Sequence, residues 1–297
     1  MNAFDIQPVR SRNWEVEEEE EETRQELQIS QPYLKFNNES WKSVDLSNRV
    51  VIVSTSDAPS IFIRSTFTDL IEIGEIIIDD IKPIKSNEII INNRCILYQS
   101  SSDKSVVFVI CQYKVESDRA FNMTETIFGL FKTPQSVIVL DSLINTLYLS
   151  TDYRHPSPPF LRVVYTSSFQ NVAQLGFIPL ESPNLVERLT AGILSYIPAI
   201  SLQNLVESSE LSVASIANFE GAVAKLHPVF QSVQESSKNK ERLALYRKMR
   251  DRRLEVRDRV IYLYLYLYIN QPSPYIAVIL INQSTTTGGQ QLASLFN

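Results

Sequence analysis

Glycine, histidine and cysteine are scarce in this sequence, and each scarcity excludes a class of functional site. Only 7 of the 297 residues are glycine, and two of these are adjacent, at Gly288 and Gly289. Loops that cradle phosphates need glycine, because they require positive φ angles and a close approach of the backbone. No Walker loop, G-x-G-x-x-G fingerprint or G-x-S-x-G elbow occurs in the chain. The sequence therefore predicts neither a nucleotide site nor a hydrolase nucleophile.

The chain contains only two histidines, His155 and His227, and both lie beside prolines. Neither belongs to a His-x-x-x-His or Cys-x-x-Cys spacing, so a zinc site is not expected. At a helix end, as expected for His227, a histidine often only satisfies the carbonyls of the last turn. We therefore predict no catalytic residues, no metal and no cofactor. One alternative is an enzyme on a nucleoside-phosphorylase-like fold, which a pocket lined by convergent polar groups would favour.

Two cysteines, Cys95 and Cys111, lie in apolar runs and are predicted to be buried free thiols. A chain without a disulfide framework is typical of a reducing compartment. The start of the sequence lacks the apolar segment of a secretory signal, and no run is long enough to span a membrane. These features place the protein in the cytoplasm or nucleus, with no membrane partner.

Short apolar runs alternate with helical patterns, which indicates a layered α/β fold. The segment 61–78 fits a helix and a strand equally well. A serine-rich turn at 100–104 predicts a hairpin between the second and third strands. Helices are expected at 119–131 and 213–226, and strands at 49–54, 89–98, 105–112, 136–140, 160–165 and 199–202. The prediction is a single α/β domain over residues 33–235, Rossmann-like or nucleoside-phosphorylase-like.

The most clearly marked helix is predicted at 182–197. Ser182 can cap it, and Pro183 suits its first position, where the missing N–H costs nothing. Pro198 ends it, because the residue before a proline avoids the α region. Its apolar stripe repeats every four residues and consists of Leu185, Leu189, Ile193 and Ile197. The helix carries no set of proton-transfer or metal-binding residues, so its predicted role is packing.

Both ends of the chain differ in composition from this domain. The run 15–22 is almost entirely glutamate, so residues 1–32 are predicted to be a disordered acidic arm. An alternative role for the arm is electrostatic attraction of a basic partner. Residues 282–297 are rich in glycine, threonine and glutamine and are predicted to be a flexible tail.

Residues 236–281 are predicted to form an extension that contains a basic helix and a β-hairpin. The segment 238–259 holds ten positive and four negative side chains. We favour a solvated helix that packs on the domain through Leu245, Met249, Val256 and Val260. Contact with nucleic acid or with an acidic protein face are the alternatives. The hairpin at 260–281 begins with tyrosines and leucines in alternation, the period of a strand.

Several motifs resemble the proteasome assembly chaperone 1 family. The resemblance covers about three quarters of the chain and includes the acidic arm. Clear matches fall between Cys95 and Ala199. They are Val107-Phe108, Cys111-Gln112, Phe128-Gly129, Pro159-Phe160-Leu161-Arg162, Pro183-Asn184-Leu185-Val186, Leu189, Ala191 and Leu194-Ser195-Tyr196. The tyrosine and leucine hairpin departs from the family's pattern.

The resemblance implies a non-catalytic chaperone that pairs with proteasome assembly chaperone 2. The pair is expected to bind α-type subunits at the outer face of the 20S α-ring and to prevent wrong ring pairing, without nucleic acid. The end of the chain, Leu295-Phe296-Asn297, resembles the hydrophobic–tyrosine–any-residue tail that enters pockets between α subunits. Phe296 stands where the family has tyrosine, which removes one hydroxyl. A frayed terminus with two incidental apolar residues is the alternative interpretation of this tail.

Overall fold

The computed structural model places most of the central part of the chain and little of its ends. The described residues are 30–79, 84–86, 89–91, 94–150, 156–167, 169, 172–208, 211–230 and 243–252. The chain divides into two compact units, one of Met1–Ile84 with Ile91–Arg250 and the other of Lys85–Ile90 with Asp251–Asn297. The second unit contains most of β4 (Ile84–Ser86) and β5 (Ile89–Ile91), which pair as a two-stranded sheet. The fold and the sites described below belong to the first unit.

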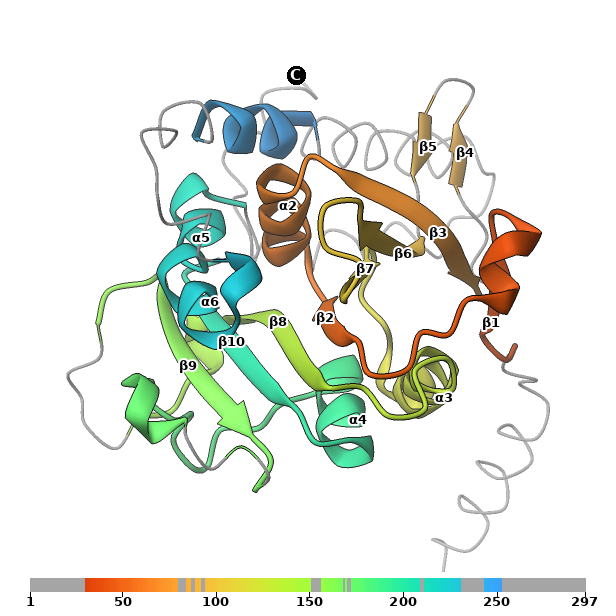
Figure 1. Cartoon of the computed structure of the whole chain (residues 1–297). Coiled ribbons are helices and arrows are strands. Elements are labelled where there is room, and N and C mark those ends of the chain that lie inside the picture. The colour runs from red at the N-terminus through yellow and green to blue at the C-terminus, as the bar shows by residue number, and fades with distance from the viewer. Residues whose placement is uncertain are drawn as a thin grey trace, which may run out of the picture. The chain divides into compact units, whose positions relative to one another are not determined.

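The first unit is built on a mixed sheet of eight strands (Figure 1). Their order across the sheet is β1-β3-β6-β7-β2-β8-β10-β9. The four central strands β7, β2, β8 and β10 run parallel, and antiparallel strands flank them on both sides. The strands are β1 (Tyr33–Phe36), β2 (Val50–Ser54), β3 (Leu70–Ile77), β6 (Cys95–Ser100), β7 (Val106–Cys111), β8 (Ser136–Ile144), β9 (Phe160–Tyr165) and β10 (Ile200–Val206).

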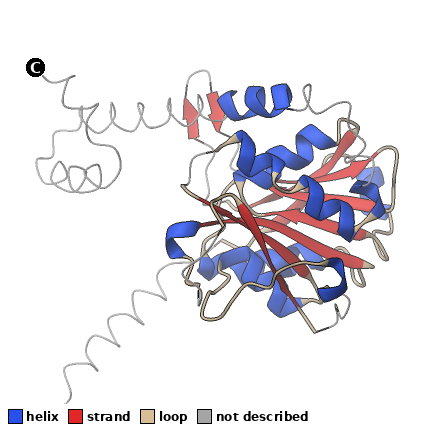
Figure 2. Ribbon diagram, turned by 90° about the vertical axis from the view of Figure 1, so that its left-hand side faces the viewer, coloured by secondary structure: helices blue, strands red, loops and turns tan. Residues whose placement is uncertain are grey.

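The central strands are apolar along their whole length because both faces of the sheet are covered. In β2 every residue is buried. Val50 and Ile52 belong to one apolar core, and Val51 and Val53 to the core on the opposite face. This is the arrangement expected for parallel strands between two helical layers, and Figure 2 shows helices on both sides of the sheet.

One face of the sheet carries α2 (Asp57–Thr66), α5 (Val213–Ala217) and α6 (Glu220–Leu226), followed by the 3-10 turn η4 (Pro228–Phe230). Phe62 of α2 lies at the centre of this layer, with its ring centroid 5.8 Å from that of Phe219 and 6.4 Å from that of Phe230. A helix at 243–252 joins the same core through Tyr246, which is fully buried. Part of the predicted basic helix therefore packs on the domain.

The opposite face is covered by α3 (Ser117–Phe128) and α4 (Arg188–Tyr196), which pack directly on each other. Their approach is closest at Gly192. A β-carbon added there would lie 2.8 Å from Thr124 Oγ1 and 3.0 Å from the carbonyl oxygen of Ala120. Glycine is therefore required at 192 by the spacing of the two helices. The described part of the unit has three further 3-10 turns, η1 (Glu39–Ser43), η2 (Asn145–Leu147) and η3 (Ala173–Leu175).

The predicted start of the helix at 182–197 is wrong. The helix begins at Arg188, as α4. Leu185, assigned to its buried stripe, is 78% exposed. Ser182 caps no helix in the structure, and the side chain of Asn184 bonds to the backbone of Leu149 in a neighbouring loop. The residues expected to form the first turn are therefore not packed against the core. Arg188, the first residue of α4, has a left-handed φ of 57°.

Two other predicted elements are divided in the structure. The helix expected at 213–226 is divided into α5 and α6, and at the interruption Asn218 donates from its side chain to Asn204 Oδ1 of β10 at 2.7 Å. The strand expected at 89–98 is two strands, β5 and β6, in different sheets. The open segment at 61–78 contains the end of α2 and all of β3.

The predicted fold class is confirmed, as is the hairpin that joins β6 and β7. Cys95 and Cys111 face each other across that hairpin as buried free thiols, with their Sγ atoms 2.9 Å apart. No helix in the described part of the chain is long and apolar enough to cross a membrane. The predicted domain boundaries stay predictions, since residues 1–29, the hairpin at 260–281 and the tail at 282–297 lie outside the described residues.

Candidate partner-binding surface

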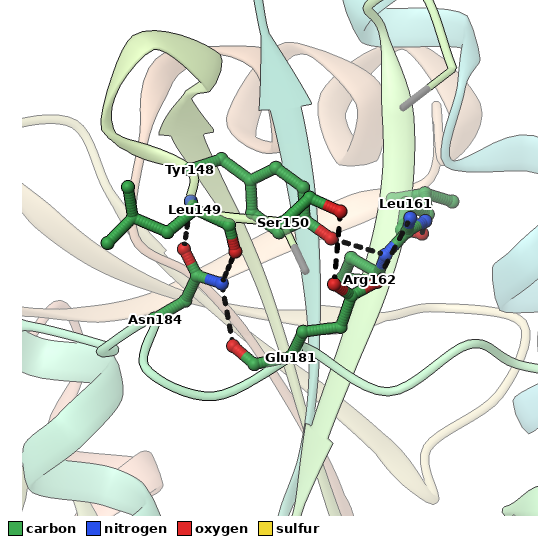
Figure 3. Close-up of polar contacts among 7 residues, drawn as sticks. All are labelled: Tyr148, Leu149, Ser150, Leu161, Arg162, Glu181 and Asn184. Atoms are coloured by element: carbon green, nitrogen blue, oxygen red, sulfur yellow. Dashed lines mark hydrogen bonds and ion pairs between the residues drawn. The ribbon is translucent and has the colours of Figure 1, made fainter. Parts of the chain in front are cut away.

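Arg162 of β9 is the centre of a polar network that also includes Asn184, and both residues lie in motifs that carry the family resemblance (Figure 3). Arg162 is only 6% exposed. Nε donates to the Tyr148 hydroxyl at 3.2 Å, and Nη1 donates to the carbonyl of Leu161 at 3.1 Å. Nη2 lies 4.0 Å from the Glu181 carboxylate. A buried charge persists only when its donors are paired, so these contacts fix the guanidinium in one position.

Two aromatic rings complete the surroundings of this arginine. The guanidinium carbon lies 4.7 Å from the ring centroid of Phe160 and 5.6 Å from that of Tyr148. The two rings meet edge to face at 5.6 Å and form a small apolar cluster with Leu205. Stacking of a guanidinium on aromatic faces is favourable, and more so where water is excluded. The segment around Tyr148 is thereby attached to strand β9.

Asn184 joins two loops at the same place. Its Oδ1 accepts from the backbone N–H of Leu149 at 2.7 Å, and its Nδ2 donates to the carbonyl of Leu149 at 2.6 Å. The same Nδ2 lies 2.6 Å from the carbonyl of Glu181. Figure 3 shows the amide between the two loops, with Glu181 also accepting from Ser150 Oγ at 3.2 Å. An asparagine that satisfies both backbone groups of one residue fixes the position of that residue.

This network holds apolar side chains out in solvent. Leu149 is 58% exposed and Leu185, next to Asn184, is 78% exposed. Ile178, also 56% exposed, lies where the segment 178–180 bonds to Val163 along the edge of β9. Exposed apolar side chains on loops that polar contacts hold in place are a feature of surfaces that bind another protein. We refer to Leu149, Ile178 and Leu185 as the apolar rim.

The described residues hold no set of three or more histidine, cysteine or acidic side chains that could bind a metal ion. His227 ends α6, where its Nδ1 accepts from the backbone N–H of Val229 at 3.3 Å. Burial lowers the pKa of His227, so a neutral acceptor is consistent with this bond. His155 and the predicted tail residues Leu295, Phe296 and Asn297 lie outside the described residues.

A cavity of about 320 Å³ opens at the carboxyl ends of the four parallel strands. Polar groups converge on this cavity. Such a pocket was the feature that would favour the alternative of an enzyme on a nucleoside-phosphorylase-like fold. Its described lining contains no histidine or cysteine. The carboxylate of Asp141 accepts from Thr190 Oγ1 at 2.6 Å and from the backbone N–H of Ser142 at 2.8 Å. The described lining therefore brings a hydroxyl and a carboxyl group into contact, without a histidine or a thiol beside them.

Sequence reasoning missed most of the apolar rim. Leu149 and Ile178 lie in loops and belong to no periodic pattern, so nothing in the sequence distinguishes them from loop residues in general. Leu185 is in the resembling motif, but its spacing to Leu189 fitted a buried helical stripe. Tyr148, which binds Arg162, also has no local signal, because the two residues meet only through the sheet.

Comparisons with known proteins agree on one family. The family described as Proteasome assembly chaperone 4 matches residues 5–255. A curated protein named Proteasome assembly chaperone 1, from Dictyostelium discoideum, is 41% identical over 241 residues, which covers 77% of this chain and 88% of the relative.

Two solved structures share the fold at low identity. A protein of unknown function from Thermoplasma acidophilum gives a TM-score of 0.58 at 12% identity, over 80% of this chain and 99% of that one. PbaA of Pyrococcus furiosus, an archaeal homolog of proteasome-assembly chaperone, gives 0.50 at 13% identity, again over 80% of this chain and 99% of its own.

Proposed function

Since this chain belongs to the proteasome assembly chaperone 1 family, a family of non-catalytic assembly chaperones, we propose that it pairs with proteasome assembly chaperone 2 during assembly of the 20S proteasome. The pair binds α-type subunits at the outer face of the α-ring, promotes ring formation and prevents rings from joining wrongly, in the cytoplasm or nucleus. The identity of 41% over 241 residues carries this proposal. The chemistry is consistent with it, because a chaperone of this kind needs complementary surfaces and no reactive centre.

We assign the contact with chaperone 2 to the apolar rim. Leu149 and Leu185 are large, solvent-exposed and rigidly held, and Leu185 lies inside the motif by which the chain resembles its family. Permanent complexes bury more apolar surface than transient ones. Two exposed leucines on fixed loops lose little conformational freedom on binding, which favours a tight contact. The α-ring is then contacted by other parts of the pair.

Co-expression tests the pairing directly. Expressed alone, the chain should aggregate or self-associate, because the apolar rim has no cover. Co-expressed with chaperone 2, it should elute as a one-to-one complex in size-exclusion chromatography with light scattering. This complex should retain α-type subunits from a mixture of purified proteasome subunits. A stable monomer that ignores chaperone 2 at micromolar concentration would contradict the proposal.

The C-terminal residues Leu295, Phe296 and Asn297 are proposed to enter a pocket between α subunits. Leu295 and Phe296 bury apolar area there, and the terminal carboxylate pairs with a lysine. On a flexible tether, such an anchor acts mainly through effective concentration once the body of the pair has bound.

Deletion of Leu295–Asn297 should weaken binding of the pair to α-rings about tenfold or more, since tethered anchors commonly add that much. Pairing with chaperone 2 should be unchanged, which serves as the internal control. Phe296→Tyr should hold or tighten the binding, because it adds a hydroxyl that contributes about 1 kcal/mol when paired. Surface plasmon resonance on immobilised α-rings gives both numbers, and equal affinity with and without the tail would reject its role.

A further inference from the structure

The cavity at the carboxyl ends of the parallel strands has no role in the function proposed above. After β2 the chain continues to β3, on the β7 side of β2, and after β7 it crosses to β8, on the other side of β2. The cavity therefore lies where the connections between strands change direction. In open α/β sheets the crevice at such a switch point is the usual place for a ligand. A volume of about 320 Å³ suits a small organic molecule.

Arg188 is the most informative residue of the lining. Its Nη1 is buried and makes no hydrogen bond, while Nη2 lies 3.9 Å from the carboxylate of the exposed Glu116. The side chain as a whole is 28% exposed, so the cost falls on Nη1 alone, a donor atom that has lost water and gained no partner. The residue also has a left-handed φ of 57°, which is uncommon outside glycine and recurs at ligand sites.

Two neighbouring groups fit the same type of ligand. Ser142 Oγ is buried and also lacks a hydrogen-bond partner. Asp141 beside it keeps a carboxyl whose pKa is raised by burial, although hydrogen bonds from Thr190 and Thr55 oppose that shift. A carboxyl with a raised pKa is neutral over a wider range of pH, so it repels an anion less and can donate a hydrogen bond when protonated.

The rest of the lining determines what else the ligand must have. Leu143, Val206 and Leu211 contribute apolar surface, which a bare inorganic ion would leave uncovered. Lys114 adds a cation, and Asp57 and Glu187 add carboxylates. Lys114 and Glu187 are exposed, so solvent and salt screen them more than the buried Nη1 of Arg188.

We propose that this cavity binds a small organic anion, with a carboxylate or phosphate at Arg188 and Ser142 and an apolar body against Leu143, Val206 and Leu211. The planar guanidinium matches either anionic group in two parallel hydrogen bonds. The site is a binding site only, and its lining contains none of the three residues of the apolar rim.

Isothermal titration calorimetry on the full-length chain, in whichever assembly state it adopts, tests this site. The probes are benzoate, phenyl phosphate and the neutral benzyl alcohol, and the comparison of the two anions identifies the preferred group. At least one anion should bind at a single saturable site, and benzyl alcohol should bind at least about tenfold more weakly. No proteasome subunit is needed, so the result does not depend on the proposed partners.

Arg188→Gln should weaken anion binding at least about tenfold, and Ser142→Ala should weaken it less, by about threefold. Arg64→Gln is the matched control, because Arg64 is an exposed arginine of α2 outside the lining. Circular dichroism melting curves separate loss of binding from loss of folding, and Ser142→Ala keeps the test valid if Arg188→Gln is unstable. Absence of saturable binding by both anions would overturn the proposal, as would binding that Arg188→Gln and Ser142→Ala leave unchanged.

Discussion

Aspartate at both Leu149 and Leu185 should weaken the complex with proteasome assembly chaperone 2 at least about a hundredfold, since burying each leucine contributes about 1.5–3 kcal/mol. The free energy of unfolding should change by no more than about 0.5 kcal/mol, because exposed substitutions rarely do more. The backbone bonds between Leu149 and Asn184 do not involve the substituted side chains, so the loops keep their positions. Biolayer interferometry gives the affinity and urea unfolding gives the stability.

Ile71→Asp is the matched control for this double substitution. Ile71 is 47% exposed on β3, near the opposite edge of the same sheet, so the control places one of the two negative charges on an exposed apolar residue outside the apolar rim. It should leave the affinity for chaperone 2 unchanged. If the double variant binds chaperone 2 normally but loses α-rings, the apolar rim is the α-ring contact, and the assignment made above is wrong.

Gly192→Leu should lower the free energy of unfolding by about 3 kcal/mol, the upper part of the range for overpacking. The new side chain would collide with Thr124 Oγ1 and with the Ala120 carbonyl, which the Thr124 hydroxyl itself bonds at 2.7 Å. Neither a backbone carbonyl nor a buried, hydrogen-bonded threonine can move aside easily. Helices α3 and α4 must therefore separate, which exposes part of the core on that face. Urea unfolding followed by tryptophan fluorescence measures the change.

Gly221→Leu is the control, since a β-carbon at 221 in α6 meets no atom within 4 Å. Leucine has a better helix propensity than glycine by about 0.8 kcal/mol, so this variant should be as stable as the parent or slightly more stable. Equal losses at the two positions would show that the effect belongs to glycine replacement in general and not to the contact between α3 and α4.

Much of the fold follows from local patterns. A run such as Val50–Ser54 has to be buried on both faces, and such a run predicts a strand between two helical layers. The order of the strands could not be predicted, because it depends on which crossover each strand makes. The helix predicted from Ser182 shows the limit of local signals. Its cap, its proline and its apolar stripe all indicated a helix, but in the structure Asn184 forms hydrogen bonds with the backbone of Leu149, which is distant in the sequence.

The candidate sites follow from the sequence only in part. Arg162 and Asn184 lie in the motifs that carry the family resemblance, but no binding role was predicted for either, because their partners are distant in the chain: Arg162 meets Tyr148, fourteen positions away. The cavity was not predicted at all. Its residues come from the ends of several strands, and Asp141, Ser142 and Arg188 belong to no motif. Only the three-dimensional structure shows that Arg188 has a buried donor without a partner.

Two short segments of chain connect the cavity to the apolar rim. Asp141–Ile144 lines the cavity and leads through η2 to Leu149, and Glu187–Thr190 lines it and begins two residues after Leu185. A ligand and a partner that both act on the same two stretches are subject to thermodynamic linkage. If an anion in the cavity changes the affinity for the partner by some factor, the partner changes the affinity for the anion by the same factor. Occupancy of the cavity would then make the chaperone's pairing depend on the concentration of the small organic anion proposed above.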